Sequence, residues 1–308
     1  MARKLGDKVM TAKEAVEKFV FDGAIVGMGG QSIGRCSMAL SHEIVRQGHK
    51  DLTLVGCNLA LSMDIMVGAG LVKRTECGTG NLERFGTAFR WRRGIEDGSL
   101  EIDDYSHLGM ATRFLAGSLG LPFMPTKSML GTDILNKKKV TADHKPFEML
   151  DNPWNPGEPV VLLPACTPDV SIIHAQKADE MGNIIIEGFT TQEPEMIKAS
   201  KAVIVSCEQI ISSDEVRRDP DRTTIPYLFV DAVVEQPWGA YPTSTYGYYE
   251  HDSDHIREYQ AVARPGGDAY QEYLQKYIYD CPTFDDYLEK AISVKKLNEL
   301  RASMLRLM

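Results

Sequence analysis

The glycine-rich segment Gly27–Gly34 is the first place in the sequence where residue types and spacing indicate a binding site. It lies between an apolar run over 24–28, which predicts a short buried strand, and a helical pattern over 36–46. Glycines in such a turn let a ligand approach the backbone, and free amides at the start of a helix attract anions. The turn therefore predicts part of a binding site for a small anionic ligand.

Two other interpretations of this turn stay open. A nicotinamide dinucleotide would need the spacing G-x-G-x-x-G, but counting from Gly27 places Ser32 where the third glycine belongs. The next predicted strand, 51–56, is followed by Cys57-Asn58 and by no acid that could bind a ribose. A tight turn without any ligand is the other interpretation.

Two further segments are expected at the same edge of the predicted sheet. Residues 77–81 (Cys-Gly-Thr-Gly-Asn) form a second glycine-rich loop after a third strand, and residues 105–107 (Tyr-Ser-His) lead into a helix. In an open parallel sheet, the loops beyond the carboxyl ends of the strands line one crevice. Each loop alone is a weak signal, but the three segments together indicate a site.

His107 has the most versatile side chain of this edge. At a strand-to-helix turn, an imidazole can donate a hydrogen bond to an oxyanion or act as a general base near neutral pH. The alternative is structural, because a histidine at this place can cap its helix or pack against it. Position alone does not decide between these roles.

Other histidines and the cysteines favour structural roles. His251 and His255 share one face of a predicted helix, but a third metal ligand is missing and Asp252 is better placed to cap the helix. His174 ends an apolar strand and is expected to be a hydrogen-bonded core residue. The six cysteines are scattered without a C-x-x-C pair, so the sequence predicts neither a bound metal nor a disulfide framework.

The elements that must position these residues alternate between helix and strand in the first half of the chain. Helical patterns run over 12–21, 36–46, 62–67 and 106–117, and strand patterns over 24–28, 51–56 and 99–102. Alternating strands and helices predict a parallel sheet covered by helices. The expected fold class is therefore α/β, with an open, mostly parallel sheet that has helices on both faces.

The second half continues the sheet and ends in a helical C-terminal region. Strand patterns occur at 160–163, 170–174, 184–186 and 202–206, and helical patterns follow residue 252, including one with a break over 284–307. Gly182-Asn183 is consistent with a hairpin turn. We expect one domain over residues 1–308, with an irregular insertion rich in Pro and Asp around 136–159.

Composition excludes several classes of function. The net charge is −9, and Lys137–Lys139 is a short solvated run and no basic stripe, so nucleic-acid binding is not expected. No apolar stretch approaches the roughly 18 residues that span a bilayer, and the polar residues 1–8 lack the apolar region of a signal peptide. We therefore expect a cytoplasmic protein that does not bind membranes.

Several segments make the chain similar to one known family. They are Gly29-Gly30 before a helix, the stretch from Gly109 to Gly131-Thr132-Asp133, His174-Ala175-Gln176 with Asp179 and Gly182-Asn183, and Val230–Pro237 followed by Gly239-Ala240 and Pro242. On these residues the chain resembles the α-type subunit of the family I CoA-transferases, and among them the glutaconate CoA-transferases. The resemblance covers nearly the whole chain.

The resemblance implies an open α/β fold, coenzyme A as part of the substrate, no separate cofactor, and an obligate β-type partner subunit in an (αβ)n assembly. In the family, CoA moves through a thioester on a glutamate of the β-type subunit, within a Glu-Asn-Gly setting that this sequence lacks. The chain should therefore be inactive alone. The resemblance assigns CoA-thioester binding to one wall of residues, namely Gly29, Gly30, Gln31, Ser32, Gly34, Arg35, Gly78, Thr79, Gly80, Asn81 and Ser106.

His107 departs from the family pattern. It falls where family members carry an amide side chain that stabilises the thioester oxyanion, and relatives that hydrolyse ring-containing CoA thioesters have an acid nearby. A histidine donates a hydrogen bond but also acts as a base. The sequence therefore predicts CoA transfer between an acyl-CoA and a carboxylic acid, with hydrolysis or decarboxylation of a CoA thioester as the alternative. A non-catalytic binding protein and an NAD-dependent oxidoreductase are the further alternatives.

Overall fold

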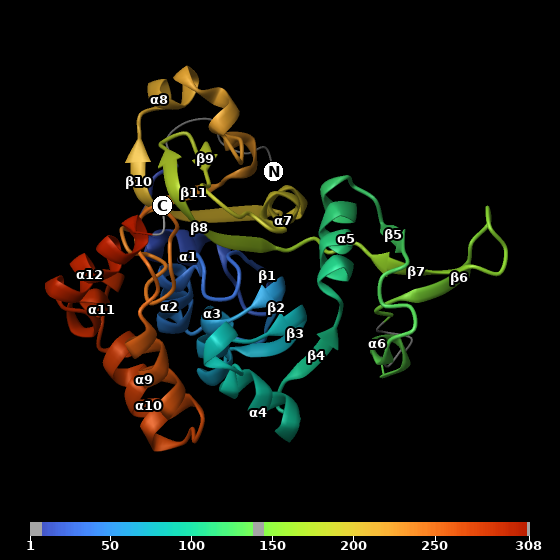
Figure 1. Ribbon diagram of the computed structural model, residues 1–308, viewed down its shortest axis with the longest axis horizontal. Helices are drawn as coiled ribbons and strands as arrows, with labels where there is room; N and C mark the ends of the chain where they lie inside the picture. The colour runs from blue at the N-terminus through green and yellow to red at the C-terminus, as the bar shows by residue number, and fades with distance from the viewer. Residues whose placement is uncertain (1–7, 138–144, 307–308) are drawn as a thin grey trace.

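The computed structural model describes residues 8–137 and 145–306, in which one large sheet has seven parallel strands in the order β11-β10-β8-β1-β2-β3-β4 (Figure 1). A short strand, β9, pairs antiparallel with β8. The strands of this sheet are β1 (Ile25–Met28), β2 (Leu52–Leu59), β3 (Val72–Gly80), β4 (Glu101–Asp104), β8 (Val170–Asp179), β9 (Ile184–Ile185), β10 (Ala202–Ile211) and β11 (Ala232–Glu235). The predicted open, mostly parallel sheet is confirmed.

Helices cover both faces of this sheet, as the sequence predicts. Successive side chains of a strand point to opposite faces, so Leu54 belongs to one apolar core and Val55 to the other. The first core also contains buried side chains of α1, α2 and α3, and the second those of α5 and α7. These helices are α1 (Ala12–Phe19), α2 (Met38–Gln47), α3 (Leu61–Gly68), α5 (His107–Ser118) and α7 (Glu193–Ala199).

The C-terminal region is helical, as expected, and it packs on the first core. Its helices are α9 (Ser253–Ala263), α10 (Asp268–Leu274), α11 (Phe284–Ala291) and α12 (Val294–Leu305), with a π-helical turn over Gln275–Tyr279. The predicted break in the last helical pattern lies at Ile292-Ser293, where the Ser293 hydroxyl accepts the backbone N–H of Lys296 and caps α12. Figure 1 shows this region beside α2 and α1.

A second, antiparallel sheet stands beside α5, with the order β5-β7-β6 (Figure 1). Its strands are β5 (Phe123–Thr126), β6 (Glu148–Asp151) and β7 (Pro159–Pro164), with α6 (Asp133–Lys137) between the first two. The sequence predicts an irregular segment here, but the structure has the strand β6. Its residues are all exposed and show no alternation of apolar and polar side chains, so no local pattern marks it as a strand. Residues 138–144 of that segment, with two of the three lysines at 137–139, lie outside the described residues.

The strand β3 differs from the prediction at its end. The sequence predicts a loop over residues 77–81, but Cys77–Gly80 continue the strand. Thr79 pairs with Asn58 of β2, and Cys77 pairs with Asp104 of β4. Backbone pairing with two neighbouring strands overcomes the weak strand preference of glycine.

The remaining elements are short. They are α4 (Phe89–Asp97), α8 (Ser213–Arg218) and the 3₁₀ turns η1 (Glu83–Phe85), η2 (Pro220–Arg222) and η3 (Tyr227–Phe229). Of the helices within the described parts of the chain, none has the length and apolarity to cross a membrane.

Candidate functional site

A cavity of about 420 Å³ lies where the turn after β1, the end of β2 and the start of α5 meet. The segment that leads into α7 forms its other side. The cavity is lined by Gln31, Cys57, His107, Leu108, Ala111, Thr112, Leu115, Phe189, Thr191, Gln192 and Glu195. Its size falls in the range of pockets that hold small organic ligands.

His107 is the first residue of α5, and its side chain is exposed in this cavity. The residue before it, Ser106, caps the helix, because its Oγ accepts the backbone N–H of Gly109 at 2.9 Å. Capping by Ser106 removes one of the two structural roles that the sequence leaves open for His107. The imidazole is therefore available to a ligand in the cavity.

Gly78 of β3 fixes the place of His107. A Cβ built on Gly78 would lie 2.3 Å from Cδ2 of His107 and 2.9 Å from its backbone nitrogen, so only glycine fits against this ring. On the other side, the thiol of Cys57 donates to the backbone oxygen of His107 at 3.5 Å. Burial raises the pKa of Cys57 to about 12, so its sulfur is a protonated thiol at neutral pH and a poor nucleophile.

Several backbone amides of the glycine-rich turn after β1 are paired within the protein. α2 begins only at Met38, so the turn itself does not start a helix. Gln31 and Gly34 exchange both backbone hydrogen bonds at 2.8 Å, and the amide of Gly30 donates to Glu193 Oε1 at 2.9 Å. The backbone amides of Gly30, Gln31 and Gly34 are thus paired within the protein, and anion binding by this turn stays a prediction.

The first two glycines of the turn serve close packing of the protein on itself. A Cβ on Gly29 would lie 2.4 Å from Cγ2 of Ile173 on β8. Gly30 has a φ of +83°, and a Cβ there would lie 2.5 Å from the backbone oxygen of Arg35. Neither residue lines the cavity.

Arg35 joins the turn to the segment on the opposite side of the cavity. Its guanidinium forms a buried ion pair of 2.5 Å with Glu193 at the start of α7. It also donates to the backbone oxygens of Phe189 at 2.7 Å and His174 at 2.9 Å. These acceptors bind the guanidinium within the protein. The substrate-binding role that the resemblance assigns to Arg35 stays a prediction.

Gln31 stands between this cavity and a second, more polar one of about 280 Å³. The second cavity is lined by Gln31, Ser32, Gly34, Arg35, Glu83, Glu187, Phe189, Ser244 and Tyr246. At its wall, Ser32 Oγ donates to the carboxylate of Glu83 and accepts from the side-chain amide of Asn58. Four predicted residues of the turn thus line one or both of these adjoining cavities, namely Gln31, Ser32, Gly34 and Arg35.

The predicted residues at the end of β3 are not brought to either of these cavities. Gly80 packs against the ring of Trp91, where a Cβ would lie 2.9 Å from Cε3. Asn81 donates to Thr79 Oγ1 at 3.3 Å and accepts the backbone N–H of Glu83 at 3.0 Å. These contacts support the local chain, and ligand binding by Thr79, Gly80 and Asn81 stays a prediction.

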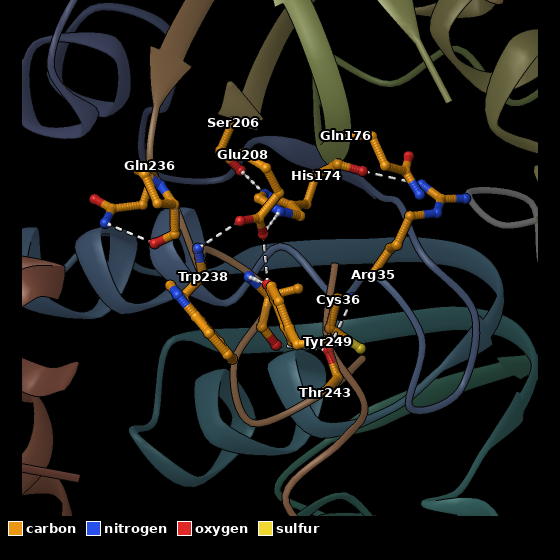
Figure 2. Close-up of polar contacts among 12 residues, drawn as sticks. Arg35, Cys36, His174, Gln176, Ser206, Glu208, Gln236, Trp238, Thr243 and Tyr249 are labelled. Carbon is orange, nitrogen blue, oxygen red and sulfur yellow. Dashed lines mark hydrogen bonds and ion pairs between the residues drawn. The ribbon is translucent and has the colours of Figure 1, made fainter. Parts of the chain in front are cut away.

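His174 is a hydrogen-bonded core residue, as the sequence predicts (Figure 2). Its Nδ1 lies 2.9 Å from Ser206 Oγ, and its Nε2 lies 2.8 Å from Glu208 Oε1. The Tyr249 hydroxyl donates to the same carboxylate at 2.6 Å, and the backbone N–H of Trp238 donates to it at 2.7 Å. These contacts join β8, β10 and the chain after β11 inside the protein.

This network explains several residues on which the family resemblance rests. A Cβ on Gly239 would lie 2.8 Å from Cε1 of His174, so glycine is required for the loop to cross the histidine. Gln176 donates to the backbone oxygens of Glu187 and Tyr246. The motif residues His174, Gln176 and Gly239 thus maintain the fold and do not face the cavity.

The predicted pair His251 and His255 contacts different neighbours. His251 Nε2 lies 2.6 Å from Nη2 of Arg84, whereas His255 Nε2 lies 3.0 Å from the Tyr287 hydroxyl. Asp252 caps α9 by accepting the backbone N–H of its first turn, as predicted. Among residues 8–137 and 145–306, no group of three or more His, Cys, Asp and Glu side chains is arranged to hold a metal ion.

Sequence reasoning missed the segment that closes the cavity before and within α7. The cavity is lined there by Phe189, Thr191, Gln192 and Glu195. Glu193 of the same segment accepts the backbone N–H of Gly30 in the glycine-rich turn. No motif marks this segment, because its residues reach the site only through the crossing from β9 to α7. A run of polar residues after a short hairpin was the only signal in the sequence.

Comparison with known proteins places the chain in a family. The family model described as Coenzyme A transferase matches residues 9–236. The chain is 37% identical to the A-subunit of glutaconate CoA-transferase from Acidaminococcus fermentans, over 94% of each protein. It is 33% identical to the A-subunit of 3-oxoadipate CoA-transferase from Pseudomonas knackmussii, over 92% of this chain and 98% of that protein. It is also 39% identical to an uncharacterized protein of Archaeoglobus fulgidus, of which it spans 66%.

Solved structures agree with the sequence comparison. The crystal structure of glutaconate coenzyme A-transferase from Acidaminococcus fermentans superposes with a TM-score of 0.90 at 35% identity, over 96% of this chain and 95% of that chain. A structure of the decarboxylase AibA/AibB superposes with a TM-score of 0.77 at 29% identity, over 88% and 98%. This chain therefore belongs to the coenzyme A transferase family.

Proposed function

We propose that this chain is the α-type subunit of a heteromeric enzyme that transfers CoA between an acyl-CoA thioester and a carboxylic acid. The observation that carries the proposal is His107, held against Gly78 with its imidazole in a ligand-sized cavity. Relatives named as A-subunits of CoA-transferases support a second, β-type subunit, in an (αβ)n assembly. Coenzyme A enters as part of the substrate.

The chain's own part in the reaction is to bind and stabilise. A glutamate from the β-type partner attacks the thioester carbonyl carbon, and negative charge develops on the carbonyl oxygen. An imidazole N–H of His107 within hydrogen-bond distance of that oxygen stabilises the charge. Gln31, at the junction of the two cavities, and the neighbouring Ser32 and Gly34 form the wall along which the substrate lies.

One carboxylate of this chain, Glu195, also lines the cavity. An experiment must therefore distinguish Glu195 from the glutamate of the partner that is expected to be the nucleophile. Trapping of the enzyme thioester with borohydride or hydroxylamine should modify the β-type subunit only. Glu195→Gln should keep this labelling. Labelling of this chain that is lost in Glu195→Gln would assign the nucleophile here and contradict the proposal.

The dependence on a partner gives a second test. The purified chain alone should not exchange CoA between acyl-CoA and free acids, and co-expression with the β-type chain from a neighbouring reading frame should restore turnover. Exchange catalysed by the chain alone would contradict the proposal. We also propose a cytoplasmic location, because the six buried cysteines are free thiols, which suits a reducing compartment.

Hydrolysis or decarboxylation of a CoA thioester is the second candidate. It is favoured by the imidazole at position 107, which can accept a proton as well as donate one, and by the structural similarity to the decarboxylase AibA/AibB. The catalytic position of the partner decides between the two. A glutamate there supports transfer, and another residue supports the second candidate.

A further inference from the structure

α5 presents one mostly apolar face to the cavity. His107, Leu108, Ala111, Thr112 and Leu115 line it, with the spacing of three and four residues that places side chains on one side of a helix. Ala111 and Leu115 follow His107 by about one and two turns. A group that extends from His107 along the helix would therefore contact apolar side chains.

The other lining residues add no positive charge. Phe189 and the protonated thiol of Cys57 are apolar neighbours, and Gln31, Thr191 and Gln192 are neutral. The one acidic side chain is Glu195. Neither lysine nor arginine occurs among the described residues that line this cavity. Beyond His107 along α5, a carboxylate would lose its hydration and meet no lysine or arginine among these lining residues.

We infer that this cavity binds the acyl chain of the thioester and that this acyl chain is apolar, without a terminal carboxylate. The inference rests on the proposed function, in which His107 donates to the thioester carbonyl oxygen. From that anchor, the acyl carbons extend along α5 between Ala111 and Phe189.

Ala111 is the residue that determines how much chain the cavity accepts. It has the smallest side chain on this face of α5 and is partly buried one turn from His107. A larger side chain at this position would occupy the space of the acyl carbons beyond the first turn. A hydrophobic site changes kcat/KM by about 10- to 200-fold for each methylene that it gains or loses.

The test compares two substrates of equal length in the complex with the β-type subunit. Hexanoyl-CoA and adipyl-CoA both carry six acyl carbons, and only adipyl-CoA ends in a carboxylate. With propionate as the acceptor, we expect kcat/KM to be at least about tenfold higher for hexanoyl-CoA. Equal or preferred use of adipyl-CoA would overturn the inference and leave the proposed function standing.

Variants of Ala111 test the position of the chain. We expect Ala111→Phe to lower kcat/KM for hexanoyl-CoA at least about tenfold more than it lowers kcat/KM for acetyl-CoA. Ala302→Phe, at an exposed alanine of α12, is the matched control and should change neither value. Ala111→Val provides a smaller insertion if the phenylalanine variant does not fold.

Two outcomes of the variant experiment are decisive against the inference. An equal loss for acetyl-CoA and hexanoyl-CoA in both Ala111 variants would show that the acyl chain does not lie along α5. Failure of the wild-type complex to turn over any of the three thioesters would overturn the proposed function, and this inference with it.

Discussion

At position 107 this chain has an imidazole in a site where the resemblance implies an amide. Both side chains have an N–H that can bind an oxyanion, but only an imidazole can also act as a general base. The structure leaves the ring exposed in the cavity, since Ser106 caps α5 in its place. Substitution of this one side chain can therefore test whether it donates a hydrogen bond to the oxyanion or acts as a general base.

Substitutions of His107 separate these roles. His107→Ala should lower kcat of the complex by about 10²–10³, the scale of losing one oxyanion donor. His107→Gln should recover most of the activity, because its amide donates without acting as a base. The measurement is CoA exchange at saturating acyl-CoA, with His49→Ala, at a histidine after α2 that lines neither cavity, as the control.

Two results would change the interpretation. Wild-type kcat in His107→Ala would make this residue structural. A glutamine variant as inactive as the alanine variant would assign base chemistry to the imidazole, which favours the hydrolase or decarboxylase.

At the scale of elements, the site depends on how closely β3 and α5 approach. The two meet at Gly78 and His107, with 2.3 Å between a Cβ built on the glycine and the imidazole ring. We expect Gly78→Ala to displace the ring and to lower kcat toward the value of His107→Ala. Overpacking should also lower the free energy of unfolding by about 1–3 kcal/mol.

The Gly78 experiment measures kcat together with urea denaturation. Lys73→Ala, at an exposed residue near the start of the same strand, is the control and should change neither quantity. A Gly78→Ala enzyme with reduced stability and unchanged kcat would show that this contact does not position the histidine.

Another contact between elements joins the glycine-rich turn to α7. Glu193 of α7 accepts the amide of Gly30 and binds the guanidinium of Arg35, two groups that the sequence assigns to a ligand. The carboxylate thus binds both groups within the protein. An acid 163 positions away in the chain cannot be linked to the turn by local pattern.

At the scale of the whole molecule, the C-terminal helices are held to the sheet domain by a buried aromatic cluster that includes His42 of α2. The His42 ring packs edge-on against Phe284 and Tyr287 of α11, with ring centroids 5.2 and 4.7 Å apart. Neither of its ring nitrogens has a hydrogen-bond partner among the residues that the structure describes. Burial holds the pKa of His42 well below its usual value, so the ring is neutral in the folded protein.

This neutral histidine should make stability depend on pH. The unfolded chain binds a proton at His42 below about pH 6.5, whereas the folded protein does not, so stability falls as the pH falls through that value. Asp64 acts in the opposite direction, because burial raises its pKa to about 6 and the folded state then binds the extra proton. The contribution of His42 must therefore be measured by difference.

The measurement is urea denaturation of the wild type and His42→Leu at pH 7.5 and pH 5.5. The loss of free energy of unfolding between the two pH values should be smaller in the variant. Because both proteins keep Asp64, its contribution cancels in the comparison. Equal losses in both proteins would contradict the assignment.

Much of the fold follows from the sequence, because its signals are local. Apolar runs at 24–28 and 202–206 and the helical pattern at 106–117 depend on neighbouring residues, and they correspond to β1, β10 and α5. β3 is not predicted to its full extent, and β5 and β6 are not predicted as strands, because pairing with other strands and not side-chain pattern determines them. The same holds for the cavity wall formed by residues 189–195.

The sequence by itself determined the α/β class, the family resemblance and the choice of His107 as the candidate catalytic residue, since these depend on residue identity and short-range spacing. Only the tertiary structure decided which of the predicted residues line a cavity. Gln31, Ser32 and His107 line cavities, whereas Gly29, Gly30 and His174 contact the protein itself. The physical reason is that each amide, ring or carboxylate pairs with the nearest group in space, and that group usually lies far away in the chain.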